Sequence, residues 1–260
     1  MNVRKFLLQS GIKIDKFLAS TKLFRSSGGK SNIVFFPGCS LSGYNPDYVF
    51  KVRDYLKCGI LTGCCAKPLK LMGETKTFQS RIEGIKSELD KINAENVITA
   101  CQNCYKILKE YDKKRNILSL WPLMLEKGLP DELRGKFNFL EASVQDSCSS
   151  TPEIITSIRE ILKYLGVNVR EFPGKQKKCC GGIQAIVTGN SDEYKRKRAE
   201  KSPCNVIISY CASCRSAMSI DGTHKSIHIL DLIFGDGEIS MTNSDIVNRF
   251  LLARRLNKGE

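Results

Sequence analysis

Short apolar runs alternate with longer amphipathic segments along most of the chain. The apolar runs are typical of buried strands, and the segments between them have the periodicity of helices. We expect strands at 32–36, 59–63, 96–100, 137–148, 168–172, 205–210 and 226–234. We expect helices at 45–57, 75–92, 152–165, 191–201 and 246–255, and one that starts within 101–104. This alternation predicts an α/β fold with parallel sheets, in which ligands gather at the carboxyl ends of strands.

The pattern of the first half recurs in the second half. We therefore expect two tandem, pseudo-symmetric parallel-sheet domains, at 31–135 and 136–260, with the last strand and helix in the second domain. Residues 1–30 form an extension, in which apolar and basic residues alternate up to residue 25 before the breaker "SSGGK". One amphipathic helix or two short ones fit this extension, packed on its own domain or docked on a partner or membrane surface through 1–25.

Cysteines follow the predicted strands in a repeated order. Each half has a single cysteine, then an adjacent pair, then a C-x-x-C pair, with offsets of 25, 36 and 3 residues in the first half and 31, 31 and 3 in the second. The first set is Cys39, Cys64, Cys65, Cys101 and Cys104, and the second is Cys148, Cys179, Cys180, Cys211 and Cys214. Only Cys58 and Cys204, of twelve cysteines, lie outside this rule, and we interpret them as ordinary buried residues.

Five cysteines per half allow several chemistries. A structural zinc needs four ligands, so it would leave a repeated cysteine unused in each half. Thiol–disulfide chemistry of the C-x-x-C pairs alone would leave six cysteines of the two sets unexplained. An iron–sulfur core larger or less symmetric than a cubane uses the adjacent pairs best, because neighbouring sulfurs could reach different irons. The alternative to an iron–sulfur core is a structural zinc site in a protein that binds a partner.

The two cysteine sets resemble the cysteine-rich "CCG" domain, which occurs twice in the CCG-domain subunit of heterodisulfide reductase. "FFPGCS" and "ITACQNC" are similar to the first domain of that subunit, and "DSC", "ILKYLG", "CCGG" and "CASC" are similar to its second. The resemblance covers about 32–235. Related domains occur in iron–sulfur subunits of glycerol-3-phosphate-, glycolate- and lactate-oxidising systems and in a quinone-reductase accessory family.

The resemblance implies that each set binds one non-cubane [4Fe–4S] cluster, with the ten cysteines named above as ligands. It further implies two clusters at a common cleft, where a small disulfide is split one electron at a time. The expected protein is therefore the iron–sulfur subunit of an oxidoreductase that reduces disulfides. The alternative is a pure electron-transfer subunit of a flavin-dependent dehydrogenase complex, with no substrate site of its own.

Two departures from the family pattern affect this interpretation. Ala66 replaces the glycine of the first pair ("CCAK"), a small change if its φ is negative, and Gln145 stands where a histidine often stands ("QDSC"). The two histidines, His224 and His228, lie in the tail, and we interpret His228 as a packed or edge residue of a strand. Basic contacts for a substrate could come from Lys67, Lys70, Lys177 or Lys178, each of which equally suits a solvated surface.

Charge and hydropathy limit the choice of partners and location. The formal net charge is +14, but lysines and arginines are interleaved with acids, and no nucleic-acid-binding motif is present, so we expect no nucleic-acid partner. No nucleotide fingerprint is present either, so we expect the electrons to come from a flavoprotein or a ferredoxin-type subunit. A basic surface suits docking to an acidic protein of this kind. No apolar run approaches the ~18–20 residues needed to span a bilayer, and the expected location is the cytoplasm.

Overall fold

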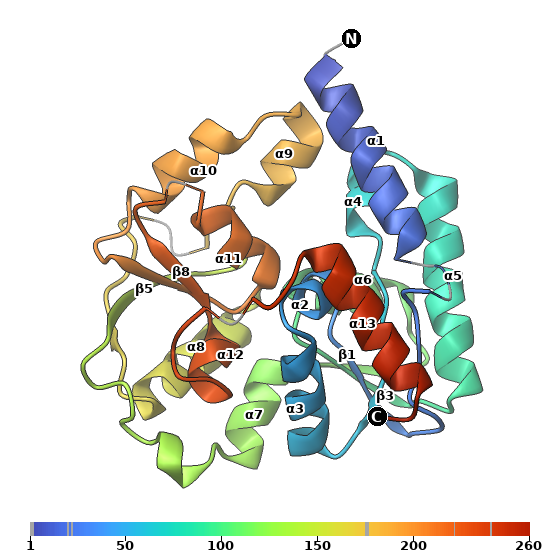
Figure 1. Ribbon diagram of the computed structural model, residues 1–260, viewed down its shortest axis with the longest axis horizontal. Coiled ribbons are helices and arrows are strands. Elements are labelled where there is room, and N and C mark those ends of the chain that lie inside the picture. The colour runs from blue at the N-terminus through green and yellow to red at the C-terminus, as the bar shows by residue number, and fades with distance from the viewer. Residues whose placement is uncertain (1–2, 20, 22, 175–176, 221, 240) are drawn as a thin grey trace. The chain divides into compact units, whose positions relative to one another are not determined.

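Two parallel sheets carry the two halves of the repeat in this computed structural model, which describes residues 3–19, 21, 23–174, 177–220, 222–239 and 241–260 (Figure 1). The first sheet has the order β2-β1-β3-β4, from β1 (Ile33–Phe36), β2 (Gly59–Ile60), β3 (Asn96–Thr99) and β4 (Asn116–Ser119). β1 pairs in parallel with β2 and β3, with Val34 opposite Val97. Val34, Phe35 and Phe36 are fully buried, as the continuous apolar run predicts for a strand covered on both faces.

The second sheet repeats this order as β6-β5-β7-β8. Its strands are β5 (Glu141–Gln145), β6 (Asn168–Val169), β7 (Val206–Ser209) and β8 (Lys225–His228). β5 pairs in parallel with β6 and β7, and β7 pairs in parallel with β8, with Val144 opposite Ile208. The predicted α/β fold class and its duplication are therefore confirmed.

Helices follow the strands in both halves. The helices before β4 are α1 (Val3–Leu18), α2 (Cys39–Tyr44), α3 (Pro46–Leu56), α4 (Lys67–Leu71), α5 (Thr75–Lys91) and α6 (Gln102–Tyr111). Those after it are α7 (Leu120–Lys127), a 3-10 turn (Asp131–Leu133), α8 (Pro152–Tyr164), α9 (Gly182–Thr188), α10 (Asp192–Ala199), α11 (Ala212–Met218), α12 (Ile229–Ile233) and α13 (Asp245–Asn257). Proline at the first turn and the Thr151 side chain, which accepts a hydrogen bond from the Ile154 amide, define the start of α8.

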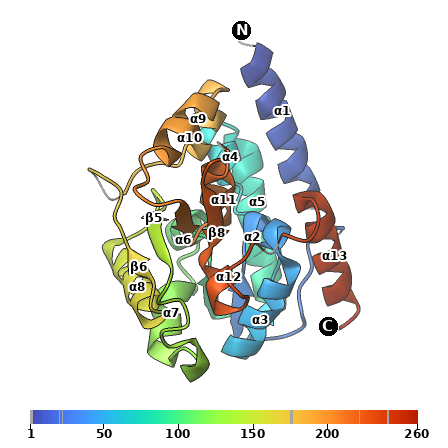
Figure 2. The ribbon, with the colours of Figure 1, turned by 60° about the vertical axis from the view of Figure 1, so that its left-hand side comes forward.

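Contacts divide the chain into two compact units. The first contains Met1–Leu118, Ile186–Gly189 and Met241–Glu260, and the second contains Ser119–Ala185 and Asn190–Ser240. These units group some residues differently from the predicted domains. α7 packs on α8, so the residues just before 136 join the second unit, and α13 packs on α2 and α3, so the C-terminal helix joins the first (Figure 2).

Several predicted strands are shorter than expected. The apolar run 226–234 is a strand only up to His228, because His228 caps a helix that begins at the next residue. The His228 ring accepts a hydrogen bond from the Leu230 amide, and the Asp231 carboxylate accepts one from the His228 amide. In the run 137–148 only Glu141–Gln145 is extended. Strand β4 and helix α7 were not predicted.

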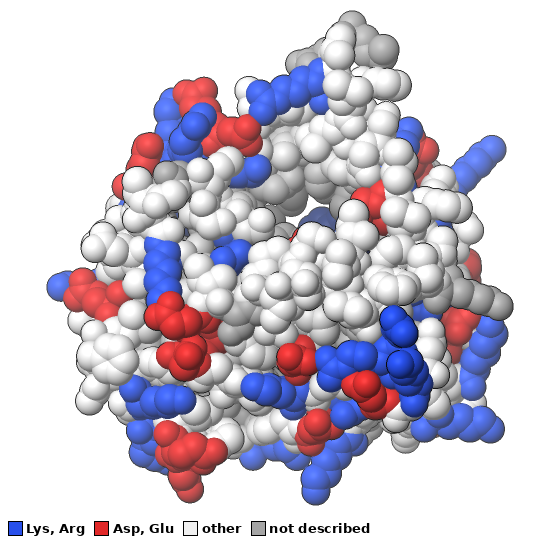
Figure 3. Space-filling view, in the orientation of Figure 1, with Lys and Arg blue, Asp and Glu red and all other residues white. Residues whose placement is uncertain are grey.

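The N-terminal extension forms one helix, α1, which packs against α4 of the same unit. Its residues are half-buried or exposed, and the exposed ones include a group of apolar side chains, Val3, Phe6, Leu7, Ile14 and Phe17. The visible surface over α1 is largely uncharged, and lysines, arginines and acids lie intermixed mainly toward the margins of that face (Figure 3). None of the helices described here is both long enough and apolar enough to traverse a bilayer.

Candidate metal centres

The ten cysteines of the two predicted sets lie where parallel strands end. In the first unit Cys39 follows β1, the Cys64–Cys65 pair follows β2, and Cys101 and Cys104 follow β3. In the second unit the same places after β5, β6 and β7 hold Cys148, Cys179, Cys180, Cys211 and Cys214. Because the carboxyl ends of parallel strands share one edge of a sheet, each set gathers at that edge.

The first set forms one continuous group of thiols. The Sγ atoms of Cys39 and Cys64 lie 3.5 Å apart. The Cys104 thiol has both Cys101 and Cys65 as hydrogen-bonding neighbours. Cys64 and Cys65 are adjacent in the chain, so this pair joins the single cysteine to the C-x-x-C pair.

The second set has the same connectivity. The Cys179 thiol has Cys148 and Cys180 as neighbours, and the Cys214 thiol has Cys180 and Cys211. All twelve cysteines lie in the described part of the chain, and none of them forms a disulfide bond there. Within that part, no group of three or more histidine, cysteine, aspartate or glutamate side chains is arranged to hold one metal ion. In both sets the adjacent pair therefore joins the single cysteine to the C-x-x-C pair.

Backbone amides donate to a sulfur atom of each adjacent pair. The Ala66 amide donates to Cys64 Sγ at 3.4 Å, and the Gly181 amide donates to Cys179 Sγ at 3.3 Å. The two loops therefore share a local geometry despite their sequence difference. The replacement of glycine by Ala66 was expected to be a small change if the φ of Ala66 were negative. Its φ is 56°, so this expectation is not met. An alanine in this left-handed region costs about 1–2 kcal/mol, and the hydrogen bond to sulfur is made nevertheless.

Gly38 lets the backbone pass close to the first set. Its φ of 78° and ψ of 156° belong to a region that is essentially restricted to glycine. A Cβ at this position would lie 3.0 Å from Cys104 Sγ and 3.2 Å from Cys101 Cβ. The glycine of "FFPGCS" is therefore required both by its backbone conformation and by the close approach of the thiols.

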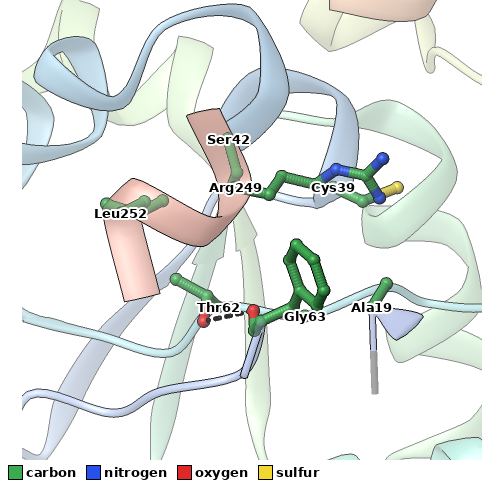
Figure 4. A pocket seen from close by; sticks show the side chains of 8 residues that line it. Ala19, Cys39, Ser42, Thr62, Gly63, Arg249 and Leu252 are labelled. Atoms are coloured by element: carbon green, nitrogen blue, oxygen red, sulfur yellow. Dashed lines mark hydrogen bonds between the residues drawn. The ribbon is translucent and has the colours of Figure 1, made fainter. Parts of the chain in front are cut away.

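Two cations with little exposure lie beside the first set. Lys16 Nζ, from α1, is 3.6 Å from Cys39 Sγ, and its side chain is 12% exposed. Asp15 joins Lys16 to Arg249 of α13, with separations of 2.5 Å and 2.6 Å. The Arg249 side chain, 10% exposed, extends alongside Cys39 in the small pocket that both line (Figure 4).

The electrostatics favour the thiolate form of Cys39, whereas hydrogen bonds and burial raise the pKa values of its neighbours Cys64 and Cys104. The hydrogen bond from Cys64 lowers the pKa of Cys39 to about 6, with help from Lys16 and Arg249 and against the effect of burial. Burial acts to lower the pKa of Lys16, but the Cys39 and Cys64 sulfurs and the Asp15 carboxylate raise it further than burial lowers it. In the second set, hydrogen bonds from Cys148 and Cys180 lower the pKa of Cys179.

Sequence reasoning missed Lys16 and Arg249 as neighbours of the cysteines. The periodicity of residues 3–18 predicts a helix, but it does not say which residues its polar face meets. Three of the four lysines considered as substrate contacts have other side-chain partners. Lys67 donates to Asn103 Oδ1, Lys70 pairs with Glu110, and Lys177 donates to the Ser150 carbonyl. The Lys178 carbonyl accepts a hydrogen bond from Gln145.

The two cysteines outside the sets lie near the opposite ends of strands. Cys58 precedes β2 and is half-buried rather than fully buried as predicted, and burial raises its pKa to about 11. Cys204 precedes β7, is buried, and faces Glu141 at 3.8 Å. Both therefore lie at the amino edge of their sheets, away from the edge where the sets gather. His228 is 1% exposed and packs near Trp121, with ring centroids 6.2 Å apart.

Comparison with known proteins gives one family match. The family described as "CCG: Cysteine-rich domain" matches residues 33–109 and again residues 142–219. No curated protein matches the chain. Among solved structures, the chain has a partial likeness to an aspartate racemase homologue from Pyrococcus horikoshii, at 12% sequence identity, with 87% of this chain and 97% of that chain covered and a TM-score of 0.31. That score is too low to support an argument. The two family matches span more than half of the chain and include both cysteine sets, and the chain therefore belongs to the CCG cysteine-rich domain family.

Proposed function

We propose that each cysteine set binds one [4Fe–4S] cluster, of the non-cubane kind expected for a protein that resembles the CCG-domain subunit of heterodisulfide reductase. The observation that carries this proposal is that all five thiols of each set form one continuous group, joined through the adjacent pair. Five contiguous thiols suit a multi-iron cluster better than a single zinc, which needs only four ligands. The ligands would be the ten cysteines of the two sets.

The residues around the thiols also suit an anionic group. The amides of Ala66 and Gly181 already donate to sulfur, and Lys16 and Arg249 supply buried positive charge beside Cys39. Hydrogen bonds to sulfur and nearby cations both raise the reduction potential of an iron–sulfur cluster. Such a cluster, when bound, supplies one-electron redox chemistry.

We infer that the protein works as the iron–sulfur subunit of an oxidoreductase that reduces a small disulfide. Its electrons would come from a flavoprotein or a ferredoxin-type subunit, and its net charge of +14 suits an acidic donor. Twelve cysteines, none of them in a disulfide bond, suit a reducing compartment, which favours the cytoplasm.

A second candidate, a pure electron-transfer subunit, is favoured by the size of the pockets beside the first set. One pocket is lined by Cys39 and Arg249 and another by Cys64 and Lys16, and each has a volume of about 10 Å³. That is about enough for one water molecule and too little for a disulfide substrate. A relay that passes electrons without binding a substrate needs no larger space.

EPR spectroscopy of anaerobically purified protein distinguishes the two candidates. For a disulfide reductase, we expect an iron–sulfur signal in the oxidised state that changes when a small thiol is added. The variant Cys211→Ser should lose the signal of the second set, whereas Cys204→Ser, outside the sets, should retain it. An iron–sulfur signal that no thiol alters would favour the electron-transfer subunit. A protein that contains zinc and no iron would contradict the proposal.

A further inference from the structure

Arg198 is a buried arginine in a helix whose preceding basic residues, Arg196 and Lys197, are exposed. It lies in the last turn of α10, within the hydrophilic run "DEYKRKR". Arg198 is 3% exposed, whereas the side chain of its neighbour Lys197 is 68% exposed and pairs with Glu193. Burying a guanidinium is costly unless an anion or several acceptors compensate for its lost hydration.

The contacts of Arg198 satisfy only part of its donor capacity. Nε donates to Gln145 Oε1 at 2.8 Å, and the guanidinium lies over the Phe172 ring at 3.9 Å from its centroid. Nη1 and Nη2 are buried, and neither has a hydrogen-bond partner among the described residues. A guanidinium has five N–H donors, so four of the five are unused within that part of the chain. Its direct partners, an amide and an aromatic ring, are neutral.

The surroundings of Arg198 belong to the second cysteine set. Phe172 shares a buried cluster with Cys180, Cys211 and Cys214. α10 packs on α11, the helix that begins directly after Cys211. Tyr194, the Asp146 carboxylate and the Cys180 sulfur also interact electrostatically with the Arg198 guanidinium, in decreasing order.

Gln145 connects Arg198 to the loop that carries the adjacent pair. Its side-chain amide is fully buried and donates to the Lys178 carbonyl at 2.8 Å, one residue before Cys179. The same side chain accepts from Arg198. The guanidinium is therefore fixed relative to the thiols and cannot turn to solvent.

We propose that Arg198 is a positioning residue for the anionic group bound by the second cysteine set, with its Nη groups donating to that group and its charge setting the group's reduction potential. This inference rests on the proposed function, in which the group is an iron–sulfur cluster. Reduction adds one negative charge to such a group, and a nearby fixed cation stabilises the reduced form more than the oxidised form. Arg198 therefore raises the midpoint potential of the second set.

The test is a redox titration of the full-length protein, followed by EPR. The transition of the second set is identified as the one that Cys211→Ser abolishes. In Arg198→Met we expect its reduction equilibrium constant to fall at least tenfold, equivalent to a shift of about 59 mV to more negative potential for one electron. Arg198→Lys keeps the charge but lacks the planar donors, so its midpoint should shift in the same direction by a smaller amount. The matched control Lys197→Met removes the same charge from the surface and should change the equilibrium constant less than twofold.

Each outcome decides between the proposals. An unchanged midpoint in Arg198→Met, with iron retained, overturns the role of Arg198 and leaves the proposed function intact. If Arg198→Met does not fold, an unchanged midpoint potential in Arg198→Lys overturns the role of Arg198 instead. Loss of iron from a folded Arg198→Met supports the role, because the charge is then needed to retain the group. Wild-type protein with no iron in the second set contradicts the proposed function itself, before any Arg198 variant is compared.

Discussion

The close approach of Gly38 to the first cysteine set makes Gly38→Ala a sharp test of the site geometry. The substitution adds one methyl group at a residue with φ 78° and ψ 156°. The methyl carbon would lie 3.0 Å from Cys104 Sγ and 3.2 Å from Cys101 Cβ, both closer than ordinary contact. Either the backbone or the two cysteines must therefore move.

Two costs add in this variant. Backbone strain in a region restricted to glycine costs about 1–3 kcal/mol. Overpacking in a buried site costs about 1–3 kcal/mol more. We expect Gly38→Ala to lower the free energy of unfolding by about 2–6 kcal/mol, the sum of these two ranges, and to reduce the iron held by the first set, because Cys101 and Cys104 are displaced.

Gly73→Ala is the matched control for this prediction. Gly73 has nearly the same φ, 79°, but a Cβ there would meet nothing within 4 Å. Its expected cost is about 1–2 kcal/mol from left-handed strain, with iron content unchanged. The assay is urea unfolding under anaerobic, reducing conditions, together with iron per chain. If Gly38→Ala costs no more than Gly73→Ala and retains all its iron, the reasoning from close approach is wrong.

Three further substitutions test other parts of the structure. Tyr210→Phe should lower the free energy of unfolding by about 1–3 kcal/mol in urea, because its hydroxyl makes three buried hydrogen bonds; a cost below about 0.5 kcal/mol would contradict this. Asn248→Ala should lower the free energy of unfolding by about 2–4 kcal/mol in the same assay, because this fully buried side chain of α13 donates to two carbonyls at the end of α2. An unchanged unfolding midpoint would show that these hydrogen bonds do not stabilise the packing of α13 on α2. Lys16→Met should reduce the iron of the first set by removing the cation beside Cys39, whereas the more exposed Lys13→Met should not; equal iron in both variants would refute the role of Lys16.

The fold class and the grouping of the cysteines could be predicted because both are repeated signals. Apolar runs such as 32–36 and 96–100 specify buried parallel strands, and a cysteine directly after each strand must lie at one edge of the sheet. Strand β4 was missed because its run is short and continues directly into α7. The run 226–234 was predicted as one strand because its apolar residues are continuous, and the end of the strand depends on the capping of α12 by His228.

The charges beside the thiols could not be predicted from local pattern. Lys16 and Arg249 come from helices at opposite ends of the chain and meet only because α1 and α13 both belong to the first unit. Arg198 stands in a run of hydrophilic residues that is typical of a solvated helix, and only tertiary packing buries it. The backbone conformation of Ala66 could not be predicted either, because an alanine in the sequence does not indicate a positive φ.

The central claim is that each cysteine set holds a four-iron cluster, and the most direct measurement is iron and acid-labile sulfide per chain in anaerobically purified protein. Two such clusters predict about eight irons and a matching amount of sulfide, falling to about four irons in either Cys101→Ser or Cys211→Ser. About four irons in the wild type would contradict loading of both sets. Zinc without sulfide would contradict the redox account altogether.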